Sequence, residues 1–89
     1  MLFYVRYRLK NEKLADLADE VHSGGFPYKA KHVFASMEDS LTGLTIWEAN
    51  DRAGIDEILS KLKNFAEVFE VIPVVSAEYA QQRIFQELY

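Results

Sequence analysis

The chain has 89 residues, of which 49% are hydrophobic and 27% are charged. A chain of this length builds one hydrophobic core, so we expect a single domain over residues 1–89. It contains no cysteine and two histidines, which excludes disulfides and thiolate metal sites; we expect no metal and no cofactor. The net charge of −4 has the wrong sign for binding nucleic acid or an anionic membrane.

The hydropathy pattern argues against a membrane protein. The longest apolar runs, such as VIPVV at 71–75, are far shorter than the roughly 20 residues of a bilayer crossing. The opening segment MLFYVR has its charge inside the apolar run and does not resemble a signal peptide. We therefore expect a cytoplasmic protein.

The first half of the chain predicts a strand, a helix and a hairpin. Alternating side chains in MLFYVRYRLK at 1–10 are typical of a strand. Apolar residues then recur at helical spacing from Asn11, a plausible N-cap, to the pair Gly24-Gly25. Strands over 29–37 and 44–49 follow, joined by a short turn. Pairing Ser36 with Leu44 would place His32 opposite Glu48, with an uncertainty of a residue or two.

The second half predicts a helix, a strand and a further helix. Asn50 or Asp51 caps a helix whose apolar stripe extends to Phe65 or Ala66. The nearly continuous apolar run at 69–75 predicts a strand, and Pro73 favours a sheet edge. Ser76 caps a last helix over 77–88, with an apolar side formed by Ile84, Phe85 and Leu88.

This order predicts an α+β fold of the ferredoxin-like kind, βαββαβ with an extra C-terminal helix and an antiparallel four-stranded sheet. Right-handed crossovers put both long helices on one face of the sheet. The strands carry apolar side chains at both odd and even positions, and therefore on both faces of the sheet, as in Phe3-Tyr4, Ile46-Trp47 and Val71-Ile72. We therefore expect a second copy to cover the other face, giving a homodimer by sheet-to-sheet packing.

Three segments carry a resemblance to a known group of proteins. GLTIWEANDRAGIDEILSKLKNF, FEVIPVV and the opening MLFYVRYRL resemble members of the dimeric α+β barrel superfamily, in particular a small family of about this length with no assigned function. The resemblance implies a closed barrel of two chains. The superfamily includes muconolactone isomerases, cofactor-free monooxygenases, haem enzymes and ligand-sensing domains of regulators, so fold alone does not fix the function.

Two residues are candidates for catalysis. His32 could act as a general base near neutral pH, and Glu48 opposite it would raise the pKa of the imidazole. The alternative is a structural pair on the sheet surface. Trp47 and Tyr7, with Tyr4 and Tyr28, could line a pocket for a planar molecule, or they could pack in the core or at a dimer interface.

These residues lead to two hypotheses for the function. In the first, the protein binds a small apolar or aromatic molecule between sheet and helices through His32, Glu48, Trp47 and Tyr7, with cofactor-free isomerisation or oxygenation as the possible reaction. In the second, it is a non-enzymatic ligand-sensing or protein-interaction module with a packed barrel interior. A cavity of about 300 Å³ or more would favour the first.

Overall fold

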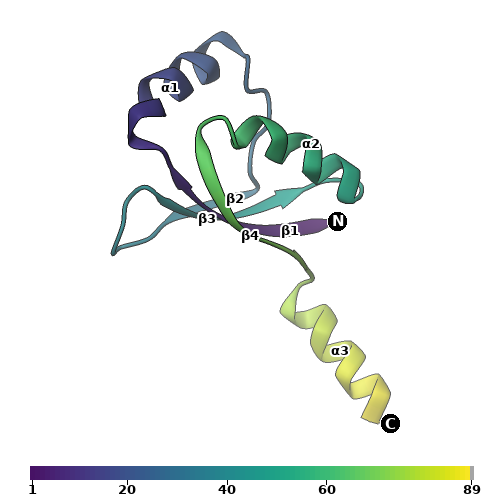
Figure 1. Cartoon of the computed structure of the whole chain (residues 1–89). Coiled ribbons are helices and arrows are strands. Elements are labelled where there is room, and N and C mark those ends of the chain that lie inside the picture. Colours follow the sequence, from purple (N-terminus) through teal and green to yellow (C-terminus); the bar gives the residue numbers. More distant parts are fainter. Residues whose placement is uncertain (89) are drawn as a thin grey trace.

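The computed structural model describes residues 1–88, with side chains up to Gln86 (Figure 1). It is an α+β fold with three α-helices and one four-stranded antiparallel sheet. The predicted order of strands and helices is confirmed. In chain order the elements are β1 (Leu2–Leu9), a 3-10 turn η1 (Asn11–Lys13), α1 (Leu14–Ser23), β2 (His32–Ala35), β3 (Thr42–Glu48), α2 (Arg52–Leu62), β4 (Ala66–Val74) and α3 (Ala77–Leu88).

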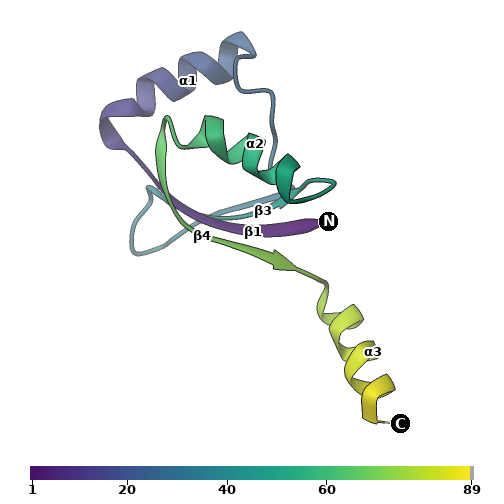
Figure 2. The same ribbon diagram turned by 45° about the vertical axis from the view of Figure 1, so that its right-hand side comes forward.

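The strands lie in the order β2-β3-β1-β4, and every neighbouring pair is antiparallel. β1 and β2 therefore run parallel with β3 between them, and β3 and β4 run parallel with β1 between them. Each of these parallel pairs is joined by a helix, which is the arrangement of two interleaved βαβ units. The fold is compatible with the predicted ferredoxin-like arrangement. Figure 2 shows α1 and α2 on the same side of the sheet, as the handedness of the crossovers requires.

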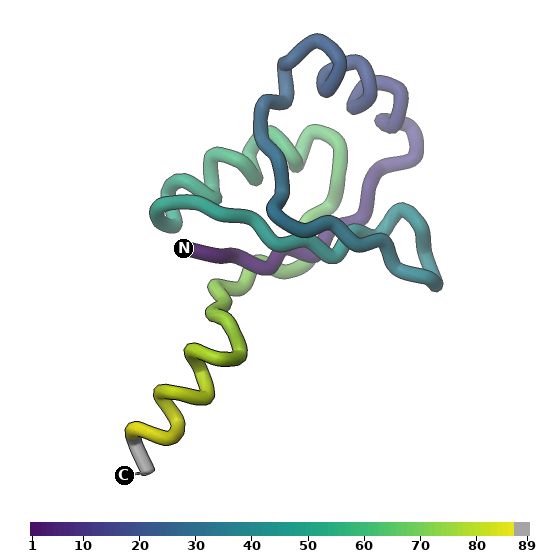
Figure 3. Tube along the Cα trace, turned by 180° about the vertical axis from the view of Figure 1, so that it is seen from behind, coloured from purple at the N-terminus to yellow at the C-terminus, as the bar shows by residue number. Residues whose placement is uncertain are grey.

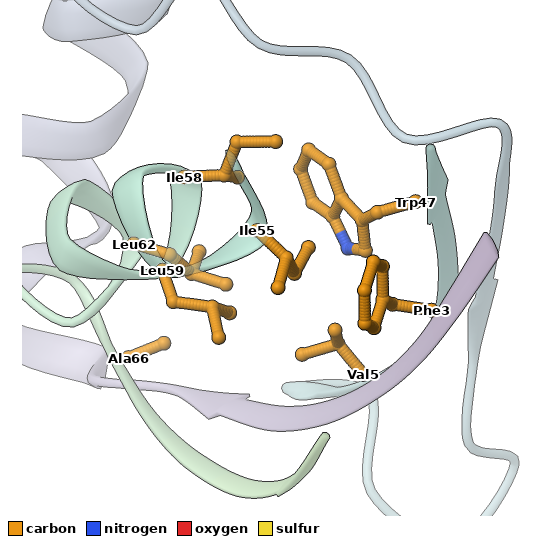
Figure 4. Packing of buried hydrophobic residues seen from close by; sticks show 8 residues of the cluster. All are labelled: Phe3, Val5, Trp47, Ile55, Ile58, Leu59, Leu62 and Ala66. Carbon is orange, nitrogen blue, oxygen red and sulfur yellow. The ribbon is translucent and has the colours of Figure 1, made fainter. Parts of the chain in front are cut away.

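The core lies between α2 and the sheet (Figure 4). The apolar stripe of α2 meets alternate residues of β1 and β3, because side chains of a strand point to opposite faces in turn. Phe3 and Val5 from β1 are essentially inaccessible to solvent. The whole cluster consists of Phe3, Val5, Trp47, Ile55, Ile58, Leu59, Leu62 and Ala66.

The two main helices are capped differently. Asp51 begins α2, and its carboxylate accepts a hydrogen bond of 2.8 Å from the backbone N–H of Gly54, as predicted for one of two candidates. The prediction that Asn11 caps the first helix is wrong, because Asn11 lies in the 3-10 turn and α1 starts only at Leu14. Gly24, with φ of 79°, ends α1 in the left-handed conformation that glycine adopts without strain.

The hairpin has a different register from the predicted one. Phe34 pairs with Leu44 and His32 with Ile46, so β2 is shifted by two residues and His32 does not lie opposite Glu48. The turn covers residues 36–41 in place of the predicted 38–43, because β2 ends at Ala35 and β3 already begins at Thr42. Asp39 organises this turn. The Asp39 carboxylate accepts hydrogen bonds from the Leu41 backbone N–H, the Thr42 hydroxyl and the Arg8 guanidinium.

Strand β4 contains an irregularity where it pairs with β1. Arg6 pairs with Glu70, whereas the next residue, Tyr7, pairs with Val68. Phe69 is thus an extra residue, which is a β-bulge. Val68 and Val71 consequently both face the helices although they are three residues apart. The predicted strand at 69–75 begins too late, because β4 starts at Ala66. The predicted apolar stripe of the preceding helix extends too far, because α2 ends at Leu62 and Ala66 belongs to β4. The predicted edge position of the strand that contains Pro73 is confirmed.

The C-terminal helix is separate from the rest of the fold. The hydroxyl of Ser76 accepts a hydrogen bond from the Tyr79 backbone N–H, which confirms the predicted cap. Figures 1 and 3 show α3 running away from the sheet, with no other element beside it. The predicted apolar side includes Leu88, whose side chain lies outside the described residues.

Candidate functional site

A pocket of about 410 Å³ lies on the helix side of the sheet, between α1, the connection that follows it and the strands. Its lining is predominantly apolar and aromatic, which is typical of a site for small molecules. The lining residues are Tyr7, Leu9, Leu17, Val21, Phe26, Tyr28, Lys29, Ala30, Val33, Trp47 and Leu62.

The pocket exists because α1 packs loosely. None of the residues of α1 is buried, whereas α2 buries four. Leu17 and Val21 on α1 face the pocket without filling it. After Gly24 the chain returns to the sheet through Phe26 and Tyr28, whose rings meet edge to face at 5.7 Å between centroids. These two aromatic residues form one wall, and their attraction helps to keep that wall in place.

Trp47 forms the inner wall and is fixed by a buried hydrogen-bond chain. The Trp47 indole N–H donates to the Thr45 hydroxyl at 2.8 Å, and that hydroxyl donates to the backbone carbonyl of Val5, also at 2.8 Å. Thr45 is completely buried. Since residues two apart on a strand share a face, the hydroxyl is placed directly beside the indole. The sequence analysis did not single out Thr45; the T-x-W spacing on a strand was the available signal.

Tyr7 lies across from Gly43, its partner in the sheet. A Cβ atom at position 43 would come within 2.6 Å of the Tyr7 Cζ atom, so only glycine lets the ring rest on this part of β3. Burial raises the pKa of the Tyr7 hydroxyl, because the phenolate would lose its hydration. Tyr7 therefore offers the pocket a neutral hydroxyl.

The mouth of the pocket carries charged neighbours. The Tyr28 hydroxyl donates a hydrogen bond of 3.3 Å to a Glu57 carboxylate oxygen, and the Lys61 ammonium lies 5.9 Å from the centre of the Tyr28 ring. Desolvation, together with the charge and hydrogen bond of Glu57, raises the pKa of Tyr28. Lys29 is the one charged residue among those that line the pocket. The rim can thus accommodate an anionic group beside Lys29.

His32 and Glu48 lie away from this pocket. Val33 lines the pocket, so the preceding residue, His32, projects from the opposite face of β2. The Glu48 carboxylate pairs with the Lys31 ammonium at 2.9 Å, and this hydrogen bond and charge lower the pKa of Glu48. The structure brings Tyr7 and Trp47 together in one pocket and leaves His32 and Glu48 exposed on the open face. Their catalytic role stays a prediction.

The open face of the sheet is apolar at several positions. Leu44 and Ile46 of β3 are partly buried there, and Phe34 and Ile72 are 62% and 44% exposed. An ion pair between Arg6 and Glu70, at 2.9 Å, crosses this face. The Arg6 guanidinium also lies 4.9 Å from the centre of the Phe69 ring. This face is a second surface on which molecules could bind.

Among the side chains that the structure describes, up to Gln86, no three or more acidic or histidine groups lie together so that they could hold a metal ion. None of the helices within residues 1–88 combines the length and the apolar character that crossing a membrane would require.

Comparison of the chain with protein-family models, with curated protein sequences and with solved structures gave no significant match. The structure supports the coarser part of the predicted resemblance, a small α+β fold with a four-stranded antiparallel sheet that is compatible with the ferredoxin-like arrangement.

Proposed function

We propose that the protein binds a small aromatic or apolar molecule in the pocket between α1 and the sheet. The observation that carries this proposal is the size and lining of the pocket: about 410 Å³, walled by Trp47, Tyr7, Phe26 and Tyr28. Aromatic walls with a few polar groups favour planar apolar ligands. Lys29 is the reason to expect a ligand with one negative charge.

The test uses two probes that share a naphthalene ring, 2-naphthoate with an anionic carboxylate and 2-naphthol with a neutral hydroxyl. Isothermal titration calorimetry should show binding of both, with 2-naphthoate the tighter. Ala30→Phe should abolish binding by filling the pocket, because Ala30 is among the lining residues. Ala53→Phe is the matched control, since Ala53 is exposed on α2 and does not line the pocket. Equal binding by the two variants would overturn the proposal.

The proposal includes a homodimer formed by sheet-to-sheet packing, in the manner of a dimeric α+β barrel. The support is the apolar character of the open face, where Phe34, Phe69 and Ile72 are each more than 40% exposed. Exposed apolar side chains on both edges of one sheet face favour an interface there. Light scattering at micromolar concentration should give twice the mass of the 10.3 kDa chain, and a monomer would overturn this part.

The same proposal includes a class of reaction. A cofactor-free isomerisation or oxygenation would use His32 as base on the open face, in the interior that two apposed sheets enclose, with Glu48 on the same face, so its substrate would be bound there and not in the helix-side pocket. His32→Ala should abolish turnover of a substrate held between the sheets while leaving the affinity of 2-naphthoate for the helix-side pocket unchanged. Retained turnover would remove His32 from the reaction and favour a ligand-sensing or interaction module.

A further inference from the structure

Helix α3 has an apolar side without a partner in its own chain. Ile84 and Phe85 are 55% and 59% exposed, and Ile84 follows Ala80 at helical spacing, so Ala80 and Ile84 lie along one side. Figure 3 shows α3 extending away from the four-stranded sheet. The chain is 54 Å long and 18 Å thin. An isolated helix of this length is marginal in water, so something else must stabilise it.

The exposed area of the chain is larger than that of a compact monomer. A compact protein of this mass exposes about 5,400 Å², whereas this chain exposes 6511 Å². The excess of roughly 1,100 Å² is more than the ~800 Å² that each partner buries in a standard interface. The radius of gyration is likewise 15.4 Å, against about 12 Å for a compact chain of this length.

Two apolar hollows flank α3. A pocket of about 520 Å³ lies at its base, lined among others by Leu2, Pro73, Val75 and Tyr79. A second, of about 250 Å³, runs along the helix beside Ala80 and Ile84. Apolar hollows of this size beside an unpacked helix are suited to side chains from another polypeptide, because filling them restores the packing density of a protein interior.

We propose that α3 is an exchanged arm, which packs the side formed by Ala80 and Ile84 on a second copy of this chain. It docks at the β2 edge of the sheet, at the end where that strand begins. His32 and Val33, the first two residues of β2, are both exposed there. The inference rests on the sheet-to-sheet dimer proposed above and adds to it which element of the partner closes the edge.

The geometry of a two-fold axis supports this placement. β2 and β4 are the two edge strands, and α3 follows β4 after only two residues. If two sheets face each other across an axis parallel to the strands, the β4 edge of one copy lies over the β2 edge of the other. Each α3 then begins at the level of the start of the partner's β2, because β4 ends opposite Leu2 and β2 begins with His32 opposite Ile46. The arrangement is self-complementary, as a two-fold interface must be.

The first test measures dimer affinity by sedimentation equilibrium. Ile84→Asp should weaken the dimer at least tenfold, because it places a charge on the docking side. Gln82→Asp is the matched control, since Gln82 lies on the opposite side of the same helix, and it should leave the affinity within about twofold. A dimer of unchanged affinity in Ile84→Asp would overturn the arm and leave the sheet-to-sheet dimer standing. A monomeric wild-type chain would overturn both, while the naphthoate titration decides ligand binding independently.

The second test does not depend on weakening the dimer, and it uses the absence of native cysteine. Chains carrying Ile84→Cys and chains carrying His32→Cys are mixed and oxidised, and the disulfides are identified by mass. The mixed disulfide should exceed the two like-with-like disulfides if α3 docks at the β2 edge. Replacing Ile84→Cys with Gln82→Cys should reduce the mixed product. Equal yields from these two helix positions would overturn the proposal.

Discussion

At the scale of single residues, the pocket depends on contacts that cross the sheet rather than on charged groups. Thr45 accepts from the Trp47 indole and donates to the Val5 carbonyl, and no buried side-chain nitrogen or oxygen among the described residues is left without a partner. A hydroxyl with two buried partners contributes through both of them, because removing it leaves a donor and an acceptor unpaired.

The first prediction follows from this chain of hydrogen bonds. Thr45→Val keeps the shape of the side chain but removes the hydroxyl, and it should lower the free energy of unfolding by about 1–3 kcal/mol. Thr45→Ser should retain the wild-type emission maximum of Trp47, since it keeps the hydroxyl. Urea unfolding followed by circular dichroism measures the first effect. An unchanged midpoint in Thr45→Val would show that the hydrogen bonds do not stabilise the fold.

The second prediction concerns Asp39 in the hairpin turn. The hydrogen bond from Arg8, with those from Leu41 and Thr42, lowers the pKa of the Asp39 carboxyl. A carboxyl whose pKa is lowered on folding stabilises the fold above its unfolded pKa of about 4, and that contribution disappears as the pH falls through the lower, folded pKa. Asp39→Asn should therefore be less stable than wild type at pH 7 and differ little near pH 2. A constant difference across this range would contradict the assignment.

At the scale of elements, the two helices over the sheet differ in how firmly they are held. α2 is capped by Asp51 and buries Ile55, Ile58, Leu59 and Leu62, whereas α1 buries none of its residues. An element with few buried contacts opens at a lower free energy than the core. α1 is also the movable wall of the pocket, so its opening would admit a ligand.

Hydrogen exchange tests this difference. The amides of α1 should exchange at least tenfold faster than those in the middle of α2, and addition of 2-naphthoate should slow exchange in α1 selectively. In parallel, Leu59→Ala should cost about 2–5 kcal/mol of stability, while Ser60→Ala, at an exposed neighbouring position, should cost little. Equal protection of the two helices would mean that α1 is fixed by contacts outside this chain.

Much of the element pattern follows from local signals in the sequence. Alternation in 1–10, the Asp51 cap, the glycine after α1 and the Ser76 cap are read from residues close together in the chain, and the structure contains each of them. The errors lie where the structure is determined by contacts between residues that are far apart in the chain. The shift of β2 comes from the turn around Asp39 and its bond to Arg8, and the early start of β4 comes from the bulge opposite Arg6 and Tyr7.

The site was predicted in part for the same reason. The alternation of side chains in the sequence puts Tyr7 and Trp47 on the helix-facing side of their strands, and both line the same pocket. His32 and Glu48 were grouped through an assumed register, and a two-residue shift separates them. The contributions of Phe26 and of Gly43 could not be read from periodicity, because one lies in an irregular connection and the other acts by the absence of a side chain.

At the scale of the whole molecule, the chain has more surface than its mass requires. The open sheet face and α3 are the two parts that the proposed dimer covers. If folding and association are coupled in this way, stability depends on protein concentration through mass action.

The fourth prediction is a melting temperature that rises with concentration. Scanning calorimetry between about 5 and 500 µM should show an upward shift, because dissociation accompanies unfolding. Ile84→Asp should melt at a lower temperature and show a weaker concentration dependence than Gln82→Asp. A melting temperature independent of concentration would indicate a monomer that is stable alone.

The bulge in β4 has a consequence for how the length of the chain can change. Losing one residue from a strand normally turns every following side chain to the wrong face of the sheet. Phe69 is the exception in β4, since it has no partner in β1. Deleting it would join Val68 to Glu70 in regular pairing with Tyr7 and Arg6, at the loss of the contact between Arg6 and the Phe69 ring. At this position of β4, therefore, deletion of a single codon leaves every remaining side chain of the strand on its original face of the sheet.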